Sequence, residues 1–215
     1  MSISNPFLRC LTLLKEHRCE YCAIGGFAVV MYGVQRFTPD INLIIEPTPD
    51  NIEALFRAAL SAKFDVMGGT TLEQARQELL NTLPSATTVG KLAFLDPQAP
   101  GFQLQIMWGL PLSFEEIQAD RVALQDEGNE FYVSSVESLA LLKAQSPRAQ
   151  DIYEAGVLAA LHGLSTPIPG LEALNAGDSI SQDVENFAGF RDEPVATKLE
   201  WLQLVLTQLG SFCVV

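Results

Sequence analysis

The sequence predicts a mixed α/β fold, in which a β-sheet carries helices on one face. Short apolar runs at Tyr21–Ile24 and Ile41–Ile45 have the length and composition of buried strands. Apolar residues also recur at helical spacing, most completely over residues 49–60. Strand and helix patterns follow one another along most of the chain, which is typical of a single sheet covered by helices.

The last quarter of the chain has a different composition. From Ser165 onwards there are two basic and seven acidic residues, and prolines and glycine cluster at Ser165–Gly170. Such a cluster is typical of a linker. We therefore expect a first domain over residues 1–163 and a helical extension over residues 164–215 that packs on it.

The overall composition narrows the possible functions. Of the 215 residues, 48% are hydrophobic and 18% are charged, which indicates a folded protein rather than a disordered one. The net charge of −13 argues against extended binding of nucleic acid, which requires a basic surface. No apolar run has transmembrane length and the first residues do not resemble a signal peptide, so we expect no membrane partner and a cytoplasmic location.

The four cysteines do not form a recognisable metal site. Cys19 and Cys22 have the C-x-x-C spacing, but no second pair or histidine cluster completes a zinc site. We expect these two, with Cys10 and Cys213, to be ordinary reduced cysteines.

The first quarter of the chain alternates helix and strand around two glycines. Asn5–His17 is predicted to be a helix, with Pro6 at its first position. After the strand Tyr21–Ile24, Gly25 and Gly26 permit a sharp turn that leaves backbone N–H groups open to a phosphate. A short helix then covers Phe27–Tyr32.

The next strand places two polar side chains together. Thr38-Pro39-Asp40 is a turn sequence, and the strand Ile41–Ile45 follows it. Because side chains alternate along a strand, Ile41, Leu43 and Ile45 share one face. Asp40 and Asn42 therefore lie side by side on the other face.

Further elements follow from caps and periodicity. Thr48 and Pro49 begin the long helix, and the capping box Ser134–Glu137 begins another that ends at Ala144. The remaining predicted strands are Phe64–Met67, Phe131–Val133 and a hairpin of Lys91–Leu95 with Phe102–Trp108. The remaining predicted helices cover Thr71–Leu80, Phe114–Asp120, Pro147–His162, Asp183–Phe190 and Val195–Leu209.

Two of the predicted helices have faces that would allow them to pack against each other. The helix Val195–Leu209 has an apolar stripe too long to remain in water. The helix Pro147–His162 has a face of small residues at Ala155, Gly156 and Ala159, which allows close approach of another helix. We expect the first of these helices to dock on the second.

The spacing of glycines and polar residues resembles the nucleotidyltransferases with a DNA polymerase β-like palm. It is most similar to the small bacterial branch grouped with AbiEii-type toxins and MNT-like proteins. That family has Gly-Gly or Gly-Ser, a spacer, and then Asp-x-Asp at the start of a strand. Here the glycines are Gly25 and Gly26, and the pair of carboxylates is represented by Asp40 and Asn42.

Two further motifs extend the resemblance to about residues 20–162. Gly33, Arg36 and Thr38 fit a Gly-x-x-Arg-x-Thr run of that branch. Later in the chain, the branch has a lysine, an arginine and an aspartate at the spacing of Lys143, Arg148 and Asp151. An alternative is purely structural, with Arg148 and Asp151 as an i,i+3 ion pair and Lys143 extending from the edge of an apolar stripe.

The resemblance implies a reaction and a site. Family members transfer a nucleoside monophosphate from a triphosphate to an acceptor hydroxyl, using Mg²⁺ held by three carboxylates. Those three positions correspond here to Asp40, Asn42 and Gln105, with Asp40 and Asn42 as the metal ligands that remain. The phosphate-binding positions correspond to Gly25, Gly26, Arg36, Thr38, Lys143, Arg148 and Asp151.

Two classes of function follow from the incomplete carboxylates. The three positions carry one formal negative charge instead of three, so we expect weak Mg²⁺ binding, if any, and impaired catalysis. The first hypothesis is a divergent nucleotidyltransferase that uses a nucleoside triphosphate. The second is a non-catalytic module, such as one of a toxin–antitoxin type system, that binds a nucleotide, a partner protein or a second copy.

Overall fold

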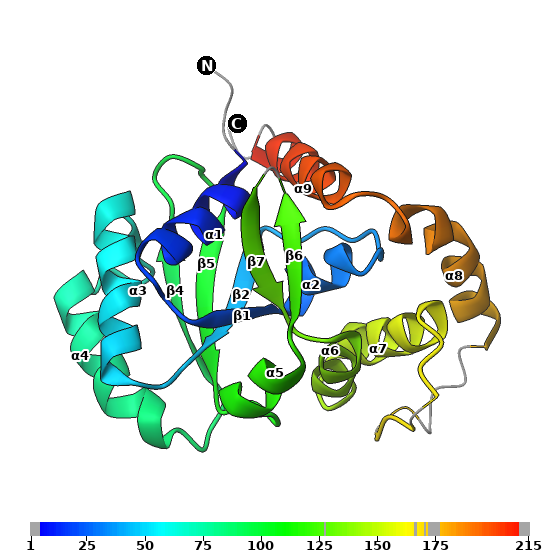
Figure 1. Cartoon of the computed structure of the whole chain (residues 1–215), viewed down its shortest axis with the longest axis horizontal. Helices are drawn as coiled ribbons and strands as arrows, with labels where there is room; N and C mark the ends of the chain where they lie inside the picture. Colours follow the sequence, from blue (N-terminus) through cyan, green and yellow to red (C-terminus); the bar gives the residue numbers. More distant parts are fainter. Residues whose placement is uncertain (1–4, 127, 166, 170, 172–176, 211–215) are drawn as a thin grey trace.

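A computed structural model describes residues 5–126, 128–165, 167–169, 171 and 177–210 (Figure 1). Its strands are β1 (Tyr21–Ile24), β2 (Asp40–Ile45), β3 (Asp65–Val66), β4 (Gly90–Leu95), β5 (Gln103–Trp108), β6 (Val122–Asp126) and β7 (Asn129–Val133). Its α-helices are α1 (Pro6–Glu16), α2 (Gly25–Met31), α3 (Pro49–Ala62), α4 (Leu72–Thr82), α5 (Phe114–Asp120), α6 (Val136–Ala144), α7 (Ala149–Leu161), α8 (Gly177–Arg191) and α9 (Val195–Gly210). A short 3₁₀ turn covers Leu83–Ser85.

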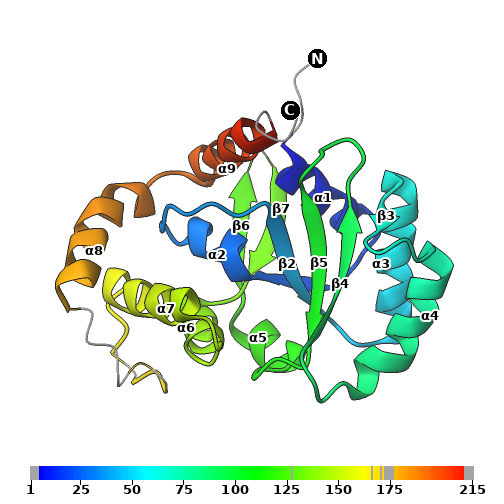
Figure 2. The ribbon, with the colours of Figure 1, turned by 180° about the vertical axis from the view of Figure 1, so that it is seen from behind.

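The described strands form one mixed sheet of seven, in the order β3-β4-β5-β2-β1-β7-β6. β2 runs parallel to β5, and β1 runs parallel to β7, whereas the other neighbours are antiparallel. The mixed α/β prediction is therefore confirmed. Helices α3 and α4 flank the β4 side of the sheet, and α6, α7 and α8 lie at the opposite side (Figures 1 and 2).

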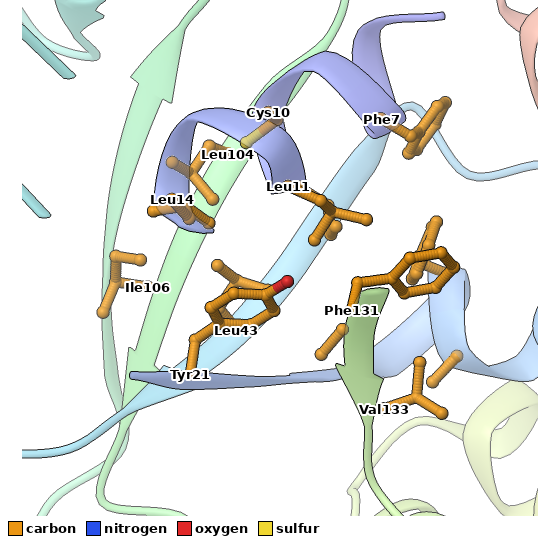
Figure 3. Packing of buried hydrophobic residues seen from close by; sticks show 14 of the residues in the cluster. Phe7, Cys10, Leu11, Leu14, Tyr21, Leu43, Leu104, Ile106, Phe131 and Val133 are labelled. Atoms are coloured by element: carbon orange, nitrogen blue, oxygen red, sulfur yellow. The ribbon is translucent and has the colours of Figure 1, made fainter. Parts of the chain in front are cut away.

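The main hydrophobic core lies on one face of the sheet, beneath α1. The buried side chains of Leu11 and Leu14 on α1 point toward Leu43 of β2 and Leu104 of β5 (Figure 3), and the Phe7 ring packs on Phe27 and Phe102. The Asn5 side chain accepts hydrogen bonds from two N–H groups of the first turn, as an N-cap does. Local capping and apolar spacing thus determine the helix that closes this core.

The second face of the sheet is also covered, which differs from the expectation of helices on one face. Cys22 and Ile24 of β1 and Ile44 of β2 pack against Phe114 and Ile117 of α5. Every residue of β1 is buried, so both of its faces require apolar cover. The amphipathic helix α5 supplies that cover.

Several predicted boundaries change in the structure. Helix α2 begins at Gly25 rather than Phe27, so both glycines lie inside its first turn. Helix α7 begins at Ala149, because Arg148 adopts an extended backbone and acts as the N-cap without a side-chain hydrogen bond. The strand expected at Phe64–Met67 shortens to two residues.

One strand was not predicted from the sequence, and one helix is longer than predicted. The edge strand β6 was not predicted, because its apolar residues Val122, Ala123 and Leu124 are consecutive and give no alternation of apolar and polar side chains. Helix α8 is longer than the predicted Asp183–Phe190. The linker expected at Ser165–Gly170 includes positions 166 and 170, which lie outside the described residues.

The buried cysteines are consistent with an unreactive role. Cys10, Cys19 and Cys22 are free and buried, and burial raises the pKa of each thiol to about 12. Such thiols stay protonated at neutral pH and are poor nucleophiles. Cys213 lies outside the described residues. Within the described residues, no helix combines the length and the apolarity that crossing a membrane requires.

The C-terminal helices pack on the rest of the chain, but not by the expected route. Helix α9 contacts α1, α2 and β6, and its Leu199, Leu202 and Leu206 join the main core. Helix α7, which was expected to receive α9, instead packs with α8, whose Asp183 accepts a hydrogen bond from Tyr153 of α7. The side chain of Leu209 is outside the described part of the structure.

Buried leucines of α9 should therefore contribute to stability. We expect Leu202→Ala to reduce the free energy of unfolding by about 2–5 kcal/mol, because it leaves a cavity in the core. Leu202 is 1% exposed, whereas Leu204 on the same helix is 56% exposed. Leu204→Ala is the matched control and should change stability by less than about 0.5 kcal/mol. Urea denaturation measures both, and equal midpoints would show that α9 is not part of the core.

Candidate functional site

A cavity of about 610 Å³ opens between the sheet and the region where α6 meets α7. Ten of the eleven residues that the family resemblance singled out line this cavity, and Gly33 is the exception. The ten are Gly25, Gly26, Arg36, Thr38, Asp40, Asn42, Gln105, Lys143, Arg148 and Asp151. The volume is in the range of small-molecule binding sites. Residues from four separate parts of the sequence are thus brought to one place.

The three positions that correspond to the family carboxylates lie on two neighbouring strands. In the parallel pairing of β2 with β5, Asp40 lies beside Gln103, and Asn42 lies beside Gln105. Asp40, Asn42 and Gln105 all face the cavity, on the side of the sheet opposite the main core. The predicted placement on adjacent strands beside the two glycines is confirmed.

The two glycines are required by the packing around them. Gly25 has a φ of 66°, a left-handed conformation that side chains disfavour, and an added Cβ would lie 2.9 Å from Asn42 Nδ2. At Gly26, an added Cβ would lie 2.6 Å from Thr38 Oγ1. The start of α2 therefore approaches the polar row of β2 closely enough that only glycine fits.

Hydrogen bonds connect the polar side chains along the sheet. Thr38 Oγ1 donates to Asp40 Oδ1 at 2.8 Å, and Asn42 Nδ2 donates to the same oxygen at 3.3 Å. On the neighbouring strand, Gln105 Nε2 donates to Gln103 Oε1 at 2.9 Å. These bonds fix the orientation of both amides.

Lys91 of β4 is a site residue that the sequence did not reveal. Its Nζ donates to Gln105 Oε1 at 3.3 Å, and its stem lines the cavity. In the antiparallel pairing of β4 with β5, Lys91 lies opposite Met107, and Ala93 lies opposite Gln105. Lys91 is therefore two residues along β4 from the partner of Gln105 and on the same face of the sheet. No local motif marks Lys91, because only the pairing of β4 with β5 brings it to Gln105.

The donor set at this position does not fit Mg²⁺. Asp40 is the one carboxylate of the three positions, and the Gln105 oxygen that could ligate a metal already faces an ammonium group. The positive charge of that ammonium group repels a divalent cation. Among the described residues, no group of three histidine, cysteine or acidic side chains forms a metal site.

A buried cluster of charges forms the wall opposite the sheet. Lys143 Nζ lies 2.8 Å from Asp151 Oδ1 and 2.6 Å from Glu154 Oε2. Arg36 Nη1 lies 2.8 Å from both oxygens of Glu154. Glu154 thereby joins the loop before β2 to helices α6 and α7, and the sequence analysis did not identify it. Its spacing of three from Asp151 on one helix was the available signal.

The ion pair of the structural alternative for Lys143, Arg148 and Asp151 is present. Arg148 lies 3.7 Å from Asp151 as an i,i+3 pair, and its side chain is 67% exposed at the mouth of the cavity. Lys143 does not extend into solvent but is buried between two carboxylates. Lys143 is therefore a structural ion-pair partner, and Arg148 remains accessible to a ligand.

The acidic residue Asp96 plays no part in the cavity. It is buried at the end of β4, where it forms an ion pair with Arg9 of α1 and accepts a hydrogen bond from the Gln98 N–H. Asp96 therefore does not replace the carboxylate that is absent at Gln105.

The cavity also has an apolar side. Phe37 and Val89 line it with 41% and 67% of their surface exposed, and Met107, Leu110 and Pro111 continue this surface. A ligand that fits both sides carries negative charge at one end and a flat or apolar group at the other.

Comparison with known proteins assigns no family. No protein-family model matches the chain, and no curated protein matches its sequence.

The buried charge cluster should make stability depend on pH. Burial opposes ionisation of Asp151, but the hydrogen bond and charge of Lys143, assisted by Ser146, outweigh it and lower the pKa. A lowered native pKa stabilises the folded state above the unfolded pKa, and this contribution is lost as the pH falls through the native value.

We expect Asp151→Asn to be less stable than the wild type at pH 7, with the difference shrinking as the pH falls below ~4. Thermal unfolding between pH 7 and pH 3 measures this difference. Glu115→Gln, at an exposed position of α5, is the control and should track the wild type. A stability loss in Asp151→Asn that is the same at every pH would contradict an ionised Asp151 in the cluster.

Proposed function

We propose that this chain is a nucleotidyltransferase-like protein that binds a nucleotide in the cavity and has impaired or no transfer activity. The observation that carries the proposal is the convergence of Asp40, Asn42 and Gln105 with Gly25 and Gly26 on one cavity. Three motifs separated by up to 80 residues of sequence meet there in the relative positions that the family resemblance implies.

The parts of the cavity suit different parts of a nucleotide. The exposed guanidinium of Arg148 and the ammonium of Lys91 are available to phosphate oxygens. Phe37 offers an aromatic face for a base. Because the position of Gln105 lacks a carboxylate, the general base of the family reaction is also missing, which supports impaired catalysis.

A protein-interaction module is the second candidate. Exposed Phe37 and Val89 at the rim of the cavity are large apolar side chains, and such exposed groups are typical of contact surfaces. The two candidates differ in what Phe37→Ala should change. Loss of nucleotide affinity supports a base-stacking role, whereas unchanged nucleotide affinity supports a role in protein contact.

Nucleotide binding can be measured directly. We expect isothermal titration calorimetry with ATP, GTP, CTP and UTP to detect binding of at least one. Arg148→Gln should weaken that binding about two- to fivefold, since an exposed ion pair contributes up to ~1 kcal/mol. Arg57→Gln on α3, an exposed arginine that does not line the cavity, is the control. Absence of binding to all four nucleotides would contradict the proposal.

The decayed site should respond to repair. Asn42→Asp combined with Gln105→Asp restores two carboxylates, so we expect Mg²⁺ to increase nucleotide affinity in this variant. In the wild type, Mg²⁺ alone should bind no more tightly than about millimolar, because one carboxylate remains. Transfer of labelled nucleotide by the variant would identify the ancestral reaction. If Mg²⁺ changes nothing in a variant that circular dichroism shows to be folded, the site is not a decayed catalytic centre.

A further inference from the structure

The cavity is more positive than the protein that contains it. Among the described residues that line it, Arg36, Lys91, Lys143 and Arg148 are cations, whereas Asp40 and Asp151 are carboxylates. The whole chain has a net charge of −13. A positive cavity in an acidic protein favours an anionic ligand, because the cations there are the places where its charge is neutralised.

Lys91 is the cation least committed to the protein itself. Its ammonium group contacts a neutral amide oxygen, and within the described residues it forms no ion pair. By contrast, Arg36 and Lys143 are held by the carboxylate of Glu154. An ammonium ion has three donors, so the contact with Gln105 leaves Lys91 able to bind a phosphate oxygen.

The Lys91 ammonium lies where a metal ion would be expected from the resemblance. It lies at the position where the resemblance implies a carboxylate and its metal, beside the amide of Gln105. Glutamine in place of a carboxylate at position 105 removes a negatively charged metal ligand. It also leaves a neutral amide beside Lys91, so the positive charge of Lys91 is not neutralised there. A carboxylate at Gln105 would pair with Lys91 and occupy its charge.

We propose that the cavity binds the polyphosphate chain of its ligand without a divalent metal ion, and that the Lys91 ammonium supplies the positive charge in place of the metal. The identity of the ligand as a nucleotide rests on the proposed function above. The metal-free mode of binding rests separately on Lys91, Gln105 and the charges of the cavity.

The test compares two probes in the presence of EDTA and of Mg²⁺. Isothermal titration calorimetry measures binding of ATP and of inorganic tripolyphosphate to the full chain and its variants. We expect the wild type to bind ATP in EDTA about as tightly as in Mg²⁺. Lys91→Gln should weaken binding of both probes by roughly tenfold or more, because a charge-assisted hydrogen bond to phosphate is lost.

Two further variants separate charge from folding. Lys91→Arg keeps the positive charge and should retain most of the affinity for both probes. Lys15→Gln removes one exposed charge from α1, on the other side of the sheet, and should leave affinity unchanged. Melting temperatures confirm that each variant is folded.

The outcomes distinguish this inference from the proposed function. If ATP binds only with Mg²⁺, or binds equally well to Lys91→Gln, the metal-free role of Lys91 is overturned while nucleotide binding stands. If tripolyphosphate binds in a Lys91-dependent way but no nucleotide binds, the inference stands and the proposed function fails. If neither probe binds, both are overturned.

Discussion

β2 pairs in parallel with β5 through the register that sets Asn42 beside Gln105, and the geometry of the cavity depends on this pairing. A shift of one residue in either strand would turn the polar row of β2 or β5 into the main core and expose Leu43 or Leu104. Because those leucines are buried beneath α1, the packing of the core holds the polar row in place on the other face. The packing of the core therefore determines which side chains face the cavity.

The buried charge cluster attaches the rest of the cavity to this sheet. Glu154 binds Arg36 from the loop before β2 and Lys143 from α6, so three separate elements share one carboxylate. A buried charge without a partner is costly, so these groups stabilise the arrangement only as a complete set. This requirement fixes α6 and α7 against the loop. Among the cations that line the cavity in the described residues, Arg148 and Lys91 are the two that Glu154 does not pair.

The resulting cavity differs in chemistry from a metal-dependent one. The three positions that the resemblance equates with carboxylates carry Asp40, an amide at Asn42 and an amide at Gln105 with an adjacent ammonium. Substitutions of this kind exchange a site that attracts cations for a site that attracts anions. Under the function proposed above, the cavity holds a nucleotide whose phosphate charge is balanced by cations of the protein.

The sequence by itself determined the local elements and the polar row. The period of two from Ile41 to Ile45 placed Asp40 and Asn42 on one face, and caps such as Thr48 fixed where helices begin. These features depend on neighbouring residues, so the sequence contains their signal. The tertiary structure alone decided the cover of the second face by α5, the docking of α8 on α7, and the positions of Lys91 and Glu154. Each of these depends on a contact between residues far apart in the chain, and such contacts leave no local pattern.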